Sequence, residues 1–224
     1  MQKRPLGLSG LETAPLVFGG NVFGWTADRE RSFALLDAFA DAGFNAIDTA
    51  DAYSRWVPGN TGGESETIIG GWMKARGRRD DVLILTKVGS AMGQNGDDDR
   101  HDLSPGWIER AVEDSLRRLQ TDVIDLYQAH WPDERTPQEE TLRAFDNLVQ
   151  AGKVRAIGVS NHTADATSEA LAISAREGLA RYETLQPHYN LYSRSTFEGP
   201  LQDLAVAQGL GVITYFSLGA GFLT

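Results

Sequence analysis

Short apolar runs alternate with longer stretches of helical periodicity along most of the chain, and this alternation constrains the fold more than any other feature. VLIL at 82–85, VIDLY at 123–127 and VRAIGV at 154–159 have the length and the β-branched content of buried strands. Each is followed by a segment in which apolar residues recur every three or four positions, the pattern of a helix with one buried face. Because parallel strands need a long crossover connection, usually a helix, the sequence predicts a parallel sheet covered by helices.

The boundaries of these elements are marked by capping residues and glycines. Asp28 is a plausible helix N-cap, Ser104-Pro105 supplies an N-cap and a first-turn proline, and Gly152 and Gly178 follow helical segments. The expected strands are 16–18, 46–47, 82–85, 123–127, 154–159, 184–185 and 210–214, and the expected helices are 28–42, 65–76, 104–119, 137–150, 163–176 and 195–208.

Two folds fit this alternation: an open doubly wound sheet and a (β/α)8 barrel. The segment GGNVFG after the first strand is not the G-x-G-x-x-G loop of the open sheet, and the chain has no Walker A pattern. The spacing of the strands suits a barrel. We therefore expect an α/β fold, a (β/α)8 TIM barrel formed by a single domain over residues 1–224. The chain covers about seven of the eight βα units, and its C-terminal part is expected to be missing.

Composition excludes several classes of function. The net charge of −10, with scattered Lys and Arg, argues against a nucleic-acid partner. The absence of cysteine excludes disulfides, cysteine metal sites and a cysteine nucleophile. The start MQKRPLGLSG lacks the apolar core of a signal peptide, and no apolar run approaches membrane length. A cytoplasmic protein with no membrane partner is the expectation.

Polar residues follow the expected strands at the end where barrel enzymes carry their active sites. Asp48 follows the second strand, Lys87 the third and His130 the fourth. Taken singly, each has a structural interpretation: a turn cap, a solvated strand end and a core histidine. Together they converge on one mouth of one barrel. Lys87, on the neighbouring strand, is the natural partner for an Asp48 carboxylate that burial would otherwise penalise.

Tyr53 lies in the loop just beyond Asp48, where a nearby ammonium is expected to stabilise its phenolate and lower its pKa. His130 could orient a carbonyl oxygen or bond to the phenol, whereas Asp51 is interpreted as loop structure. The set provides a proton donor beside an oxyanion site, but no strong nucleophile and no electron source. Reduction of a carbonyl would then need a hydride carrier.

Three further strand ends offer groups that could bind such a carrier. Asn161 follows the fifth strand, Gln186 the sixth, and the flat face of Tyr215 ends the seventh. Phe23, Trp25, Trp56 and Trp131 fall in loops at the predicted mouth and could form an apolar pocket for an aromatic or aliphatic aldehyde, although we expect at least one of them to pack the loops instead. The loop 90–102, with Asp97 to Asp99, is expected to be solvated and to hold no metal.

Several long segments resemble the aldo-keto reductase family: LGLSGLETAPLVFGGNVFG, FNAIDTADAY, TGGESETIIG, ILTKVG, DLYQAHWPD, GKVRAIGVSNH, LQPHYNLYSR and ITYFSLGAGFLT. The resemblance spans the chain and is closer to the bacterial and potassium-channel β-subunit-like branches than to the mammalian aldose reductases. It implies a (β/α)8 barrel whose bottom is plugged by a hairpin, here the first 14 residues.

The resemblance also implies function: an NADP-dependent reductase that converts aldehydes or ketones to alcohols. It implies a catalytic tetrad of Asp48, Tyr53, Lys87 and His130, with Tyr53 as the general acid. The implied cofactor is NADPH. The choice of NADPH over NADH comes from the family and not from any residue of this sequence. The residues that it implies for cofactor binding are Gly20, Asn21, Asp48, Ser160, Asn161, Gln186, Tyr215, Ser217, Leu218 and Gly219.

Three other classes of function compete with this one. A cofactor-binding redox sensor or subunit with low turnover remains open, although the intact tetrad counts against it. A metal-dependent barrel hydrolase could use His130, His162 and His188, but no His-x-His pair follows the first strand. A retaining glycosidase would need two carboxylates at strand ends, and the seventh strand offers Tyr215 instead. The sequence does not define the physiological substrate or the oligomeric state.

Overall fold

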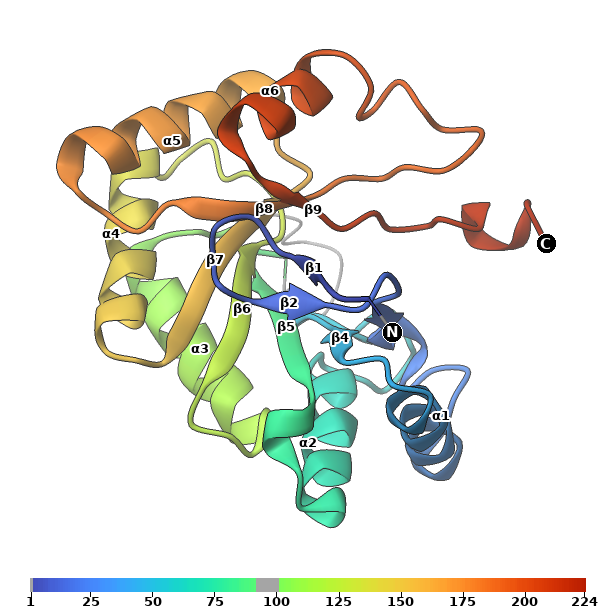
Figure 1. The fold of residues 1–224 in the computed structure, drawn as a ribbon. Helices are drawn as coiled ribbons and strands as arrows, with labels where there is room; N and C mark the ends of the chain where they lie inside the picture. Colours follow the sequence, from blue (N-terminus) through green and yellow to red (C-terminus); the bar gives the residue numbers. More distant parts are fainter. Residues whose placement is uncertain (1, 92–100) are drawn as a thin grey trace.

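A parallel sheet surrounded by helices forms the body of the molecule, and the computed structural model describes residues 2–91 and 101–224 of it (Figure 1). Seven strands are hydrogen-bonded in the order of the sequence, β3-β4-β5-β6-β7-β8-β9, and every pair is parallel. The strands are β3 (Phe18–Gly19), β4 (Ala46–Asp48), β5 (Leu83–Val88), β6 (Ile124–Ala129), β7 (Val154–Ser160), β8 (Tyr182–Gln186) and β9 (Gly211–Val212). This curled α/β sheet confirms the predicted barrel fold, with β3 and β9 at the two ends of the strand order.

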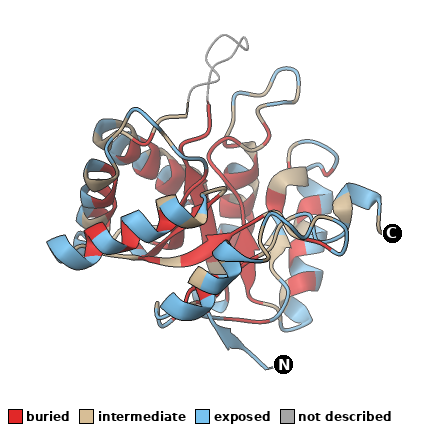
Figure 2. Cartoon of the chain, turned by 90° about the horizontal axis from the view of Figure 1, so that it is seen from above, coloured by how far each residue is buried: buried red, intermediate tan, exposed pale blue. Residues whose placement is uncertain are grey.

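Helices follow the strands and cover the outside of the sheet. They are α1 (Arg29–Asp41), α2 (Glu64–Arg76), α3 (Pro105–Leu119), α4 (Gln138–Gln150), α5 (Ala164–Glu177) and α6 (Pro200–Gln208), with short 3-10 turns η1 (Gly20–Val22), η2 (Arg79–Asp81) and η3 (Gly219–Gly221). Figure 2 shows buried residues along the strands and on the helix faces turned toward them, and exposed residues on the outer faces. Within the described residues, no helix is both long and apolar enough to cross a membrane.

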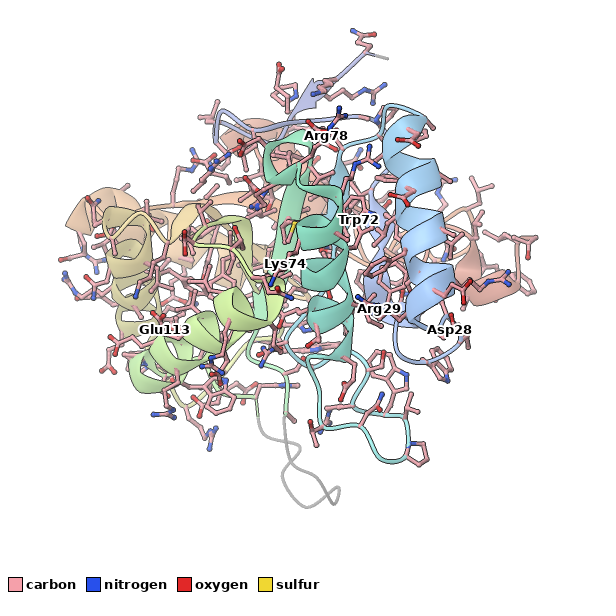
Figure 3. The ribbon with its side chains drawn as sticks, turned by 90° about the horizontal axis from the view of Figure 1, so that it is seen from below. Asp28, Arg29, Trp72, Lys74, Arg78 and Glu113 are labelled. Carbon is pink, nitrogen blue, oxygen red and sulfur yellow. The ribbon has the colours of Figure 1, made fainter. Side chains whose placement is uncertain are left out.

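Neighbouring helices are joined to one another by specific contacts. Trp72 of α2 lies between α2 and α1 (Figure 3), and its indole Nε1 donates a hydrogen bond of 2.8 Å to Asp37 on α1. Between α2 and α3, Gly70 lies so close to its neighbour that an added Cβ would fall 2.2 Å from the Arg118 carbonyl oxygen. A side chain at position 70 would therefore force α2 away from α3.

The core has an outer and an inner part. The outer part lies between the sheet and the helices and contains the larger side chains, among them Trp72, Tyr127 and Phe145. The inner part lies inside the curled sheet and is formed by Leu6, Leu11, Ala46, Leu85, Leu126, Ala156 and Ile213. Leu6 and Leu11 belong to the antiparallel hairpin of β1 (Arg4–Pro5) and β2 (Glu12–Thr13), which confirms the predicted N-terminal hairpin.

Most predicted element boundaries agree with the structure within a few residues, but α6 is an exception. It was expected from residue 195 and begins at Pro200, because Gly199 has a φ of +94° and interrupts the helical backbone. The Asp28 cap is present and accepts a hydrogen bond from the Arg31 backbone N–H, whereas Ser104 occupies the cap position of α3 without a side-chain bond. The Asp97 to Asp99 run lies outside the described residues.

Candidate active site

An ion pair between Lys87 and Asp48 occupies the carboxyl end of the sheet. Lys87 lies near the end of β5 and is fully buried, and Asp48 is the last residue of β4. The Lys87 Nζ atom lies 2.6 Å from Asp48 Oδ2, 2.8 Å from the Thr49 carbonyl oxygen and 3.3 Å from the Tyr53 hydroxyl. Each of its three protons thus has an acceptor, as a buried ammonium requires.

The second oxygen of Asp48 is held by two amide side chains. Gln186, at the end of β8, donates from Nε2 at 2.9 Å, and Gln128 of β6 donates from Nε2 at 3.3 Å. Donors from β5, β6 and β8 therefore fix the carboxylate. Sequence reasoning missed Gln128, although an amide near the carboxyl end of a buried strand was a usable signal.

The Tyr53 hydroxyl is in hydrogen-bond contact with the ammonium of this pair. Its ring is packed against Lys87, whose Nζ lies 4.9 Å from the ring centroid. Burial raises the pKa of Tyr53, the Lys87 charge lowers it, and the Asp48 charge raises it again, so the net pKa is above 10.0. The predicted net lowering is therefore wrong in direction: Lys87 acts as expected, but burial outweighs it.

His130 completes the group from the segment after β6. Its ring lies edge-on to Tyr53 with a centroid separation of 5.8 Å, and its Nδ1 lies 2.8 Å from Ser90 Oγ. Burial lowers the pKa of His130 well below 6.5, and the charges of Lys87 and His101 lower it further. The imidazole is therefore neutral at physiological pH, and Ser90 is a contact that sequence reasoning did not identify.

The candidate cofactor residues at the ends of β7 and β8 form a connected network. Ser160 donates from Oγ to the Gln186 carbonyl oxygen at 2.9 Å. Asn161 donates from Nδ2 to the His130 carbonyl oxygen and accepts from the Tyr215 hydroxyl at 2.7 Å. A cavity of about 510 Å³ is lined by Asn161, Gln186 and Tyr215 together with Trp131. Its volume is in the range of small-molecule sites.

The other candidate cofactor residues lie on two segments. Gly20 follows β3, and an added Cβ there would lie 2.9 Å from Ser65 Oγ and 3.2 Å from the Asp48 carbonyl oxygen, so glycine is required by packing. Asn21 is the next residue in η1. Ser217, Leu218 and Gly219 follow Tyr215 on a largely exposed segment that enters η3, and Ser217 Oγ lies 3.1 Å from Thr214 Oγ1.

The predicted aromatic pocket is formed in part. A second cavity, of about 490 Å³, is lined by Trp56 and Trp131 with Tyr53 and His130. Trp25 reaches this region through an edge-to-face contact with Trp56 at 6.0 Å. Phe23 does not line it: the side chain is completely buried and stacks on Phe18 at 5.4 Å. The assignment of Phe23 to the pocket is corrected, because its loop turns the ring into the core.

The histidines of the metal-hydrolase alternative do not converge. His162 Nδ1 contacts the Ser160 carbonyl oxygen at 2.8 Å, and His188 stacks on Tyr215 at 5.3 Å. Over residues 2–91 and 101–224, no group of three or more His, Cys, Asp or Glu side chains could hold a metal ion. Nothing in the described part of the chain supports that alternative.

The fold and the site together define an α/β barrel protein with a buried Asp–Lys pair, a tyrosine and a neutral histidine at the carboxyl ends of its strands. The model of the Aldo/keto reductase family matches residues 15–224. The chain belongs to the aldo/keto reductase family, whose members are oxidoreductases.

Individual relatives agree with this assignment. The chain is 40% identical to aldo-keto reductase YhdN of Bacillus subtilis over 92% of its own length and 57% of the relative's. It is 37% identical to a probable voltage-gated potassium channel subunit beta of Oryza sativa over 100% of its length and 66% of the relative's. Among solved structures, the holo form of aldo-keto reductase AKR11C1 from Bacillus halodurans superposes with a TM-score of 0.83 at 32% identity, over 100% of this chain and 69% of that one.

Proposed function

We propose that the protein reduces aldehydes or ketones to alcohols with NADPH as hydride donor and Tyr53 as general acid. The observation that carries the proposal is the position of Lys87 Nζ, which bridges the Asp48 carboxylate at 2.6 Å and the Tyr53 hydroxyl at 3.3 Å. A buried phenol beside a buried ammonium is a proton donor whose conjugate base is stabilised where the proton leaves.

The residues at the ends of β7 and β8 fit a nicotinamide dinucleotide. Asn161 and Gln186 provide amide groups at the wall of the larger cavity, and Tyr215 provides a partly exposed aromatic ring whose hydroxyl is fixed by Asn161. Ser217, Leu218 and Gly219 would border the pyrophosphate, and Gly20 and Asn21 the ribose. When bound, NADPH supplies the hydride, which no side chain of the protein can provide.

The protein's own groups would place the carbonyl and its proton. Tyr53 protonates the carbonyl oxygen, and Lys87 stabilises the tyrosinate that results. His130 is neutral, so it can hydrogen-bond the carbonyl oxygen without adding a second charge beside Lys87. Trp56 and Trp131 line the adjacent cavity and would hold the apolar part of the substrate.

A second candidate is a cofactor-binding subunit with low turnover. It is favoured by the 37% identity to a probable voltage-gated potassium channel subunit beta. The experiment that separates the two combines NADPH affinity with NADPH consumption on a panel of aldehydes and ketones. Tight binding with turnover supports the reductase, and tight binding without turnover on any carbonyl supports the subunit.

A further inference from the structure

Asp51 is a buried carboxyl group that the proposed reaction does not use. Its side chain is 2% exposed, and neither carboxyl oxygen has a hydrogen-bond partner among the described residues. Asp51 lies in the turn between Asp48 and Tyr53. Its backbone N–H donates a hydrogen bond to the Lys87 carbonyl oxygen at 3.2 Å. The Asp51 carboxyl group is therefore buried in the segment that links Asp48 to Tyr53.

A second buried acid, Glu66 of α2, faces the same region and already has its partners. Its Oε1 accepts from Thr86 Oγ1 at 2.6 Å, and its Oε2 accepts from Arg118 Nε at 2.6 Å. Glu66 is fully buried. The Arg118 guanidinium of α3 is thus paired with Glu66, as the Lys87 ammonium is paired with Asp48.

The groups around Asp51 contain more acid than base. Glu66 faces it from α2, Arg118 from α3, Lys87 from β5 and the Tyr127 hydroxyl from β6, and Tyr53 lies on its own loop. Three carboxyl groups, those of Asp48, Asp51 and Glu66, share the two cations. A third buried negative charge would have no cation of its own, and such a charge is costly to bury.

We propose that Asp51 holds a proton in the folded protein at neutral pH, so that Lys87 balances one carboxylate and not two. Burial raises the pKa of Asp51 to about 8. The Glu66 charge also raises this pKa, whereas the Arg118 and Lys87 charges lower it. An ionised Asp51 raises the pKa of Tyr53, which makes the tyrosine a weaker acid. The proton on Asp51 is independent of the proposed function, but its effect on turnover rests on that function.

The sign of the pH effect on stability follows from the two states. The unfolded carboxyl has a pKa of 3.8 and the folded one a pKa of about 8, so the unfolded chain releases its proton first as the pH rises. Asp51 therefore lowers the free energy of unfolding progressively between these two values. Asp51→Asn keeps the shape of the neutral acid and removes that slope.

The direct test is carbon-13 NMR of protein labelled at the aspartate carboxyl carbons, titrated from acid to alkaline pH. We expect one resonance, absent in Asp51→Asn, to titrate above neutrality. An Asp51 resonance that titrates below pH 5 would overturn the proposal. If the asparagine variant does not fold, the Asp51 resonance can be assigned in the wild-type protein. The pH at which that resonance titrates then decides the proposal in the same way.

Thermal unfolding and turnover test the consequences. The Tm of Asp51→Asn should rise relative to wild type as the pH rises from 5 to 9. The control is Asp125→Asn, which removes a buried carboxylate paired with Arg79 at 2.7 Å and Arg155 at 2.9 Å and should lower the Tm at neutral pH. In Asp51→Asn, kcat at pH 6 should be retained within about threefold, and the inflection of kcat near pH 8 should disappear.

The outcomes separate the two proposals. An inflection that persists in Asp51→Asn would refute the influence of Asp51 on Tyr53. A wild-type protein that reduces no carbonyl at any pH would refute the proposed function, while the NMR titration would still decide whether Asp51 holds a proton.

Discussion

Lys87 and Asp48 form a buried ion pair across two adjacent parallel strands, with 2.6 Å between Lys87 Nζ and Asp48 Oδ2. Burial opposes the charge on Lys87, but the neighbouring Asp48 and Tyr53 oxygens raise its pKa above 10.5. The ammonium is therefore retained at neutral pH. It makes the Asp48 carboxylate tolerable inside the sheet and presents a positive charge to Tyr53.

Removal of Lys87 alone should leave the Asp48 carboxylate buried without a cation. Lys87→Met is expected to lower the free energy of unfolding by about 3–5 kcal/mol, unless Asp48 takes up a proton. The double variant Asp48→Asn/Lys87→Met loses both charges together, so it should recover much of this stability without recovering activity. A double-mutant cycle in urea measures the coupling. Additive losses would show that the two charges do not interact.

His130 should contribute a pH dependence to stability. Its folded pKa lies well below 6.5 because of burial, Lys87 and His101. As the pH falls through 6.5, the unfolded chain binds a proton that the folded protein does not, so the free energy of unfolding decreases toward acid pH. His130→Gln should remove this part of the slope, as measured by urea unfolding between pH 5 and 8. An unchanged slope would mean that His130 has the same pKa in the folded and the unfolded protein.

Tyr215 should contribute to the affinity for NADPH. Tyr215→Ala removes the ring and is expected to weaken cofactor binding by about 1–2 kcal/mol, by analogy with aromatic pairs. Tyr215→Phe is the matched control, because it keeps the ring and loses only the bond to Asn161. Fluorescence titration gives both dissociation constants. An alanine variant with the wild-type constant would exclude a stacking role.

Trp56 should affect the binding of substrate. It lines the cavity next to Tyr53 and contacts the Tyr53 ring edge-on at 5.5 Å. Trp56→Ala is expected to raise KM for aromatic aldehydes more than Trp25→Ala, because Trp25 contacts Trp56 and is not among the described residues that line the cavity. Steady-state kinetics on one aromatic aldehyde compare the two. Equal effects would place the substrate elsewhere in the mouth.

The sequence predicted those parts of the site that depend on topology. The carboxyl ends of parallel strands meet at one edge of the sheet, so Asp48, Lys87 and His130 could be grouped from strand positions alone. The N-terminal hairpin followed from the resemblance of the first residues. The start of α6 was placed too early, because helical periodicity does not reveal that the backbone at Gly199 has a positive φ.

The remaining features depend on packing, which periodicity does not report. The pKa of Tyr53 is set by burial against the Lys87 charge, and a sequence gives the charge but not the burial. Phe23 and Trp56 both lie in mouth loops, yet one ring turns into the core and the other toward the cavity. Gln128 contacts Asp48, and Ser90 contacts His130. Both contacts depend on side-chain directions that only the folded chain defines.

The most direct test of the proposed reaction is NADPH consumption by Tyr53→Phe with a carbonyl substrate that the wild-type protein reduces. Phenylalanine keeps the ring and removes the hydroxyl that lies 3.3 Å from Lys87 Nζ. We expect kcat to fall by about 10²–10⁴-fold, the usual contribution of general acid catalysis, while the Kd for NADPH stays close to that of wild type. A kcat near the wild-type value would contradict the assignment of Tyr53 as the proton donor.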